Sequence, residues 1–286
     1  MEQRDREKVE NQLVVKDNEL ITRASYNLTM EEQKLLCYVI SKIKPTDKEF
    51  ERYTISAMDF AELCGIDKRH IYRDFKKMVE SFEQKAQWIK IDDNNIYFRV
   101  FSEAEYNESK GSITVVINSR LKKYLLNLQS NYTKYELWNI LSLKSKYSIR
   151  LYELFRSYSY QKEKEFDVEQ IKSLLCAEHY TLYANFKQRV LDKAIAEINE
   201  YTDLIVSYKT KQEGKSHRVK SLTFYIKRKQ HLELLEAYYK TVDKINKRER
   251  QIPGQMSIFD KDMELHIAEQ SDQKDYSKPL KLYRDY

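Results

Sequence analysis

The chain has 286 residues, of which 41% are apolar and 34% are charged, so it is long enough for about two globular domains and too apolar for a disordered protein. Only four glycines and three prolines are available for tight turns, which disfavours a sandwich or barrel of many short strands and favours a mostly helical α+β fold. The formal net charge of +6 is modest for this length and does not by itself indicate nucleic-acid binding.

Membrane insertion and export are not supported by the sequence. No stretch reaches 18 apolar residues, and the first dozen residues are charged without an apolar segment. The three cysteines, Cys37, Cys64 and Cys176, lie far apart in apolar helical surroundings and form no C-x-x-C motif. We therefore interpret them as buried thiols in a reducing cytoplasm.

The N-terminal part of the chain predicts an arm followed by a helix. Residues 1–17 are charged without periodicity and are expected to form a flexible arm, with order beginning near Leu20. Thr29 and Glu32 match a capping box, and apolar residues then recur at helical spacing. This helix is expected to end before Pro45, and a short strand at residues 53–55 follows.

The next segment predicts a winged helix. Ser56 begins a short helix that ends at Gly65, and a longer helix over residues 67–84 follows after a tight turn. Strand-like runs come next, the first two joined by a polar turn at residues 92–95; they lie at residues 88–91, 96–101 and 113–117. A helix-turn-helix followed by a β-hairpin is the plan of a winged-helix domain.

The same order of elements returns in the second half of the chain. Thr133 and Glu136 are predicted to begin a helix, the helical pattern continues over residues 147–158, and a short helix is expected at residues 167–175. A long helix, two strands and the polar loop between the strands complete the unit, at residues 181–201, 204–209, 219–227 and 210–218.

A direct alignment supports this repeat. Residues 71–79 and 182–190 align without gaps, and four of the nine positions are identical. A Leu-Cys pair precedes each segment at distances that differ by one residue. Four identities in nine positions could arise by chance, but the shared order of elements favours a duplicated domain. We therefore predict two tandem winged-helix domains.

Candidate DNA-binding residues lie on the third helix of the first domain. If Phe75 faces the core, the opposite face carries five side chains that can donate hydrogen bonds: Arg69, His70, Arg73, Lys76 and Lys77. Arginine and lysine there suit contact with phosphates and guanine edges in a major groove. A solvated helix surface is the alternative, and the position in a helix-turn-helix favours DNA.

The corresponding helix of the second domain combines amides with cations: Asn185, Lys187, Gln188 and Arg189. Amides can read adenine, and cations can read guanine or bind phosphate. For each residue an ordinary surface position is the alternative.

The predicted hairpin of the second domain is strongly basic. Residues 209–229 contain eight Lys or Arg against one Glu, a local charge of +7. Side chains expected to contact DNA lie on and beside its loop: Lys209, Lys211, Lys215, His217, Arg218 and Lys220. A solvated hairpin tip is the alternative, but the excess of positive charge favours a wing on DNA.

The sequence lacks the motifs of enzymes that act at replication origins. The four glycines are isolated, so no P-loop for a nucleotide is present. The five histidines are scattered, which argues against metal-assisted nicking by a tyrosine. The sequence therefore predicts no catalytic residue, no metal and no cofactor.

A short apolar segment interrupts the charged tail. Its residues Gln255, Met256, Ile258 and Phe259 resemble the glutamine-led peptide, ending in an aliphatic-aromatic pair, that binds the bacterial replication sliding clamp. The motif is short, and packing of this segment on the second domain of the same chain is the alternative.

Three longer segments resemble the RepA/RepB-type initiators of theta-replicating plasmids, especially those of Gram-positive bacteria. They are NELITRASYNLTMEEQKLL at residues 18–36, KSKYSIRLYEL at 144–154 and FKQRVLDKAIAEIN at 186–199, and the likeness extends over about residues 18–228. The resemblance implies binding to double-stranded origin DNA at directly repeated sites called iterons. It also implies that the second winged helix dominates base readout, while the first adds contacts and dimerisation.

The resemblance further implies monomeric and dimeric forms, melting of an AT-rich region, recruitment of host initiator and helicase-loading proteins, and repression of the initiator's own promoter. A winged-helix transcriptional repressor without an initiation role is one alternative, and a nuclease or relaxase is another. The expected division is an arm, two winged helices, a C-terminal helix and a flexible tail, at residues 1–17, 18–130, 131–230, 231–250 and 251–286.

Overall fold

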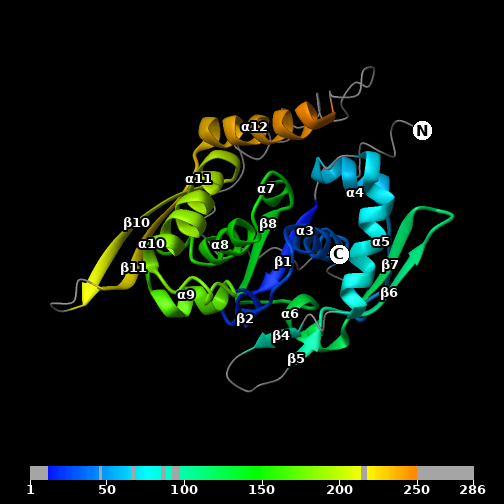
Figure 1. Ribbon diagram of the computed structural model, residues 1–286, viewed down its shortest axis with the longest axis horizontal. Coiled ribbons are helices and arrows are strands. Elements are labelled where there is room, and N and C mark those ends of the chain that lie inside the picture. The colour runs from blue at the N-terminus through cyan, green and yellow to red at the C-terminus, as the bar shows by residue number, and fades with distance from the viewer. Residues whose placement is uncertain are drawn as a thin grey trace.

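Each half of the chain folds into a winged helix (Figure 1), and the buried apolar residues of the two units form one continuous core. The computed structural model describes residues 12–44, 47–65, 68–84, 88–91, 97–213 and 218–249. In each unit a helix leads into a strand, further helices and a two-stranded wing. The predicted α+β fold with two tandem winged helices is therefore confirmed, with strands forming a large part of it.

The first winged helix is built on a three-stranded sheet. Its elements in chain order are α3 (Met30–Ile40), β3 (Arg52–Ser56), α4 (Ala57–Cys64), α5 (Ile71–Gln84), β6 (Phe101–Asn107) and β7 (Ser112–Ile117). The strand order is β3-β7-β6, so the first strand pairs with the second strand of the wing. Alternate residues of the central strand β7 are buried, as expected for a strand with one face on the core: Ile113, Val115 and Ile117.

The second winged helix repeats this connectivity. Its elements are α8 (Lys146–Ser157), β9 (Glu163–Asp167), α9 (Val168–Leu174), α10 (Tyr183–Phe186), the π-helix η3 (Lys187–Leu191), α11 (Asp192–Tyr201), β10 (Leu204–Glu213) and β11 (Arg218–Arg228). The strand order β10-β11-β9 again pairs the first strand with the second wing strand. Phe75 and Phe186, which are aligned in the sequence repeat, are both buried. The repeat therefore corresponds to equivalent positions in the two units.

Capping residues define the helix ends, as the sequence predicted. The Thr29 hydroxyl accepts from the backbone N–H of Glu32, and the Glu32 carboxylate accepts from the backbone N–H of Thr29, which completes a capping box. The Ser56 hydroxyl accepts from the backbone N–H of Asp59 at the start of α4. Gly65 ends α4 with φ 58°, a left-handed conformation that costs glycine little.

The wing of the first unit is not the hairpin that the strand pattern indicated. That hairpin exists as β4 (Trp88–Ile91) and β5 (Tyr97–Arg99), but it pairs with β2 (Ala24–Ser25) in a separate sheet, and its turn lies outside the described residues. The wing consists of β6 and β7 instead. Alternation of apolar residues shows that a strand is half-buried, but does not show which strand it pairs with.

The N-terminal strand corrects two further predictions. β1 (Leu13–Asp17) pairs antiparallel with β8 (Tyr132–Glu136), so order begins well before Leu20. For the same reason Thr133 and Glu136 lie in a strand and do not begin a helix. Two segments that are distant in the chain form this pair of strands, and the residue pattern of either segment alone does not indicate its partner.

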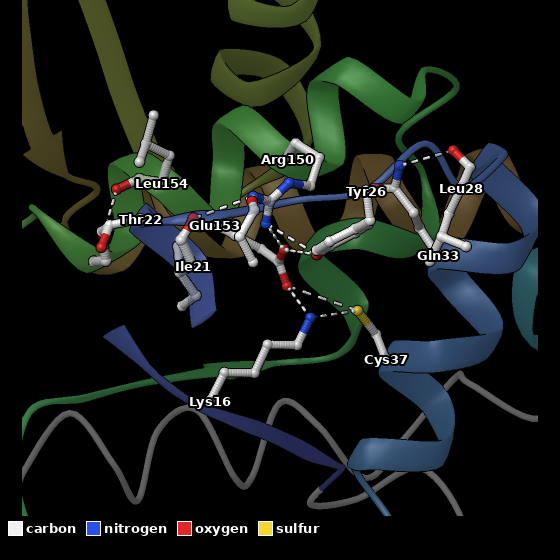
Figure 2. A network of polar contacts seen from close by, with 12 residues as sticks. Lys16, Ile21, Thr22, Tyr26, Leu28, Gln33, Cys37, Arg150, Glu153 and Leu154 are labelled. Carbon is white, nitrogen blue, oxygen red and sulfur yellow. Dashed lines mark hydrogen bonds and ion pairs between the residues drawn. The ribbon is translucent and has the colours of Figure 1, made fainter. Parts of the chain in front are cut away.

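A buried ionic cluster joins β1 to α8 (Figure 2). The Lys16 ammonium lies against one carboxylate oxygen of Glu153, and Arg150 lies 3.3 Å from the other. The hydroxyl of Tyr135 also donates to Glu153, and Arg150 donates to the Tyr26 hydroxyl at 2.9 Å. The cluster therefore satisfies charged groups that burial would otherwise destabilise.

Opposite charges keep the buried groups of this cluster ionised. Burial alone would raise the pKa of Glu153, but Lys16 and Arg150 lower it below its ordinary value. Burial alone would lower the pKa of Lys16, but Cys37 and Glu153 raise it above its ordinary value. The ion pair is consequently charged across the neutral pH range.

Two helices connect the winged-helix units. α8 contacts α2 (Asn18–Thr22) and α3 of the first unit and α11 of the second. The C-terminal helix α12 (His231–Glu249) contacts α4 of the first unit as well as α11 and α7 (Trp138–Leu141). The segment after residue 130, which the sequence division assigns to the second unit, therefore packs on both.

The cysteines differ in their exposure. Cys37 and Cys64 are buried, whereas Cys176 is half-buried in a left-handed turn with φ 50°. The prediction of buried thiols is therefore wrong for Cys176, because the chain leaves the helical pattern at that residue. Within the described ranges, no helix has the length and apolar character needed to cross a membrane.

Candidate nucleic-acid interface

The basic face predicted for the first recognition helix is exposed. All five predicted side chains are accessible: Arg69, His70, Arg73, Lys76 and Lys77. The last three lie on α5, opposite Phe75, which is 1% exposed. Arg69 and His70 lie in a short 3-10 turn, Lys68–His70, and not in the α-helix itself. The structure thus brings the five residues to the start and outer face of one recognition helix.

The wing turn of the first unit approaches this helix at Gly111. A Cβ atom at that position would lie 2.1 Å from Cε1 of Tyr72 on α5, and Gly111 has φ 55°. Its carbonyl accepts from the backbone N–H of Ala57, at the start of α4, at 2.9 Å. A glycine therefore allows the wing turn to contact both helices of the helix-turn-helix.

The strands of the first wing carry acidic side chains. Glu103 and Glu105 on β6 are exposed, and both lie near Arg52 on β3, at 2.8 Å and 3.4 Å. The wing turn adds exposed Glu108 and Lys110. Because carboxylates repel phosphates, the recognition helix rather than the wing is the surface of this unit that suits DNA.

The second recognition helix exposes three of its four predicted residues, Asn185, Gln188 and Arg189. Phe186 and Val190 on the other side are buried. A π-helical turn, Lys187–Leu191, interrupts the long helix that the sequence predicted. Such turns are frequent at functional sites, because one extra residue per turn changes which side chains share a face.

The fourth predicted residue, Lys187, forms an ion pair. Its Nζ lies 2.7 Å from Oδ2 of Asp192, and Oδ1 of Asp192 accepts from the Tyr208 hydroxyl on β10 at 2.8 Å. Partial burial would raise the pKa of Asp192, but the hydrogen bonds from Lys187 and Tyr208 lower it. Asp192 therefore links the recognition helix to the wing. Sequence reasoning missed it, because a spacing of five residues brings side chains together only across a π-turn.

The second wing presents its predicted cations on exposed strand positions: Lys209, Lys211, Arg218 and Lys220. The strands are longer than predicted, because β10 continues to Glu213 and β11 begins at Arg218. Residues 210–213 and 218 of the expected loop therefore belong to the strands. Lys215 and His217 lie outside the described residues.

Acidic residues from neighbouring elements reduce the charge of this wing. Lys211 lies 3.5 Å from Glu165 on β9, and Arg218 lies 3.7 Å from Glu169 on α9. All four side chains are at least 48% exposed, so the pairs are weak and phosphates can replace the carboxylates. The charge counted over residues 209–229 missed these acids because they come from an earlier part of the chain.

Two further predictions concern the tail and metals. The proposed clamp peptide lies outside the described residues: Gln255, Met256, Ile258 and Phe259. In the part of the chain that the structure describes, no three His, Cys, Asp or Glu side chains gather in a way that could hold a metal.

The recognition elements of the two units lie at opposite ends of the molecule (Figure 1). α10, β10 and β11 form one end, and α5, β6 and β7 form the other. Each end combines a helix of exposed polar and basic residues with a two-stranded wing. This fold and these surfaces define a tandem winged-helix protein with a candidate nucleic-acid interface in each unit.

Family models agree with this class. Residues 13–156 match the model "Initiator Replication protein, WH1", and residues 167–226 match "Initiator Rep protein, WH2". The chain belongs to this family of winged-helix replication initiators, since the first model alone covers half of it. That match includes β1 and all but the last residue of α8, and both of these elements contact α3 of the first unit.

Individual relatives are distant. The chain is 24% identical over 204 residues to a replication initiation protein of Escherichia coli, which covers 67% of this chain and 63% of the relative's length. It is 23% identical over 218 residues to an uncharacterized 27.6 kDa protein of Escherichia coli, covering 70% of this chain and 91% of the other. The Pi initiator protein, solved in complex with iteron DNA, has the same fold with a TM-score of 0.62 and 21% identity, over 77% of this chain and 99% of that one.

Proposed function

We propose that the protein initiates replication of a plasmid by binding iterons in its origin, as a non-enzymatic initiator of the RepA/RepB type found in Gram-positive bacteria, acting in the cytoplasm. One observation carries the proposal: this chain, which belongs to the initiator family, exposes Asn185, Gln188 and Arg189 beside a wing with several exposed cations. The Pi initiator protein, which has a similar fold, was solved with iteron DNA, and this supports the same class of ligand.

The second winged helix reads the bases in this proposal. Asn185 and Gln188 are suited to the N6 and N7 edge of adenine, and Arg189 to the O6 and N7 edge of guanine. Lys209 and Lys220 on the wing strands bind phosphates and set the register of the helix in the groove. Lys187 stays with Asp192 and helps to orient the helix.

The first winged helix adds affinity. The exposed cations of α5, Arg73, Lys76 and Lys77, bind phosphates or guanine edges of a neighbouring groove. Arg69 and His70 lie next to them, where the chain enters the helix. The unit also serves dimerisation, and its acidic wing stays away from the DNA backbone.

Later steps belong to the proposal because the chain is a family member. They are an exchange between dimer and monomer, melting of an AT-rich region, recruitment of the host initiator and helicase loader, repression of the protein's own promoter, and binding of the sliding clamp by the segment Gln255–Phe259. None requires a catalytic residue, a metal or a cofactor of this chain.

Footprinting of the purified protein on the DNA that flanks its own gene tests the proposal. Protection of regularly repeated sites is expected, and a plasmid that carries the gene and these sites should replicate only while the sites are intact. A single unrepeated operator would favour the transcriptional repressor. Nicking of supercoiled DNA in the presence of Mg²⁺ would favour a nuclease or relaxase.

A further inference from the structure

An apolar side chain is exposed where the second recognition helix begins. Leu182 directly precedes α10 and is 65% exposed, and its neighbours Thr181 and Ala184 are exposed as well. The aligned residue of the first unit, Ile71, is 2% exposed. The same position of the sequence repeat is therefore buried in the first unit and exposed in the second.

Aromatic side chains, and not this leucine, form the packing beneath α10. The ring of Tyr180 lies 6.4 Å from the rings of both Phe186 and Tyr147, measured between centroids. These aromatic residues cover the start of the helix from the inside. The backbone of Leu182 is nevertheless fixed, because its carbonyl accepts from the Phe186 N–H at 3.2 Å.

The exposed leucine lies at the N-terminal end of the recognition helix that carries the polar residues. Leu182 is the N-cap residue of α10, in an extended conformation with φ −86° and ψ 126°, and Asn185 in the first turn is exposed as well. The N-terminal residues of a recognition helix contact base edges in the major groove. An apolar side chain there matches only one feature of those edges, the C5-methyl group of thymine.

We propose that Leu182 is a specificity-determining residue that recognises thymine through its C5-methyl group. The inference rests on the proposed function, since it requires α10 to enter a major groove. It adds an apolar contact to the readout by Asn185, Gln188 and Arg189.

The test uses a duplex with one copy of the repeat that the protein protects in footprinting. Each thymine in turn is replaced by deoxyuridine, which removes only the methyl group, and the Kd is measured. At one or two positions the wild-type protein should bind about fourfold more weakly, the factor that corresponds to about 0.8 kcal/mol for one buried methyl group. Leu182→Ala should bind the unmodified duplex more weakly and show no further loss at those positions.

A matched control comes from α12. Leu232 is 78% exposed outside both recognition helices, and Leu232→Ala should keep the wild-type response to deoxyuridine. Equal deoxyuridine losses in wild type and Leu182→Ala would overturn the inference, as would a wild-type protein insensitive to every thymine methyl. If no site is protected at all, the proposed function fails and the inference with it, which distinguishes the two failures.

Discussion

Lys16 Nζ lies 2.5 Å from Glu153 Oε1, although 137 residues separate the two in the chain. Their side chains are 2% and 1% exposed, so the ion pair is almost entirely removed from water. Lys16 belongs to the N-terminal strand of the first unit, and Glu153 to the helix that begins the second. The pair therefore fixes β1 to α8, the helix that contacts both units.

We expect Lys16→Met to lower the free energy of unfolding by about 3–5 kcal/mol, because it leaves Glu153 as a buried carboxylate with less compensation. Urea unfolding followed by circular dichroism measures the loss. The exposed pair of Lys122 and Glu49 provides the control, since Lys122→Met should change stability by less than about 1 kcal/mol. Similar losses in both variants would show that the buried pair has no special role.

The same cluster predicts sensitivity to acid. The pKa of Glu153 is lowered in the folded protein, so its stabilising contribution is complete above the unfolded value of about 4.3 and is lost as the pH falls from that value through the lower pKa of the folded state. The free energy of unfolding should therefore decrease below about pH 5. Glu153→Gln should be less stable at neutral pH but show a flatter decrease. An unchanged pH slope in this variant would exclude Glu153 as the titrating group.

Gly111→Ala should destabilise the first winged helix. A left-handed φ costs a non-glycine residue about 1–2 kcal/mol, and the new Cβ would also displace the Tyr72 ring. In Tyr72→Ala the ring is absent, so adding Gly111→Ala should then cost only the backbone part. Thermal and urea unfolding of the two single variants and the double variant measure this coupling. Strictly additive losses would mean that the Tyr72 ring moves aside without cost.

The recognition helix and the wing of the second unit should respond differently to mutation. Gln188→Ala and Arg189→Ala should each weaken binding to the protected repeat by about 1–3 kcal/mol and reduce discrimination against other sequences. Lys209→Ala should weaken all sequences alike and reduce the salt dependence by about one unit of slope.

Fluorescence anisotropy on specific and random duplexes at several salt concentrations separates the two effects. Lys48→Ala, an exposed lysine outside both recognition helices and wings, is the charge-matched control. If the helix variants lose equally on both duplexes, their residues contact phosphates and do not read bases.

The tail segment predicts a separable partner interaction. A Gln255→Ala, Phe259→Ala double variant should lose pull-down by the bacterial sliding clamp while its footprint on origin DNA stays the same. Pull-down equal to that of the wild type would reject the clamp peptide.

Local sequence patterns were sufficient to predict the ends of α3 and α4 that carry capping residues, and to predict the duplication. A capping box at Thr29, the cap at Ser56 and the glycine at the end of α4 involve residues a few positions apart, so their chemistry can be recognised in the sequence. Helical spacing likewise assigned Phe75 to the core and placed Arg73, Lys76 and Lys77 on the exposed side.

The candidate DNA-contacting groups were predicted only in part. The exposed positions of Asn185, Gln188 and Arg189 agree with helical periodicity. The ion pair that engages Lys187 was not predictable, because it depends on a π-turn and on Tyr208 from the wing. The acids Glu165 and Glu169, which lie beside the wing cations, are also distant in the chain.

The amino-acid sequence by itself determined the helix caps at Thr29, Ser56 and Gly65, the apolar face of the first recognition helix, and that the unit occurs twice, because these properties depend on residues within a few turns of one another. Only the tertiary structure decided which hairpin is the wing, that β1 pairs with β8, and that Lys16 meets Glu153. Strand pairing and buried ion pairs depend on segments that only the whole fold brings together. They contribute to the free energy of folding only once both partners have left water.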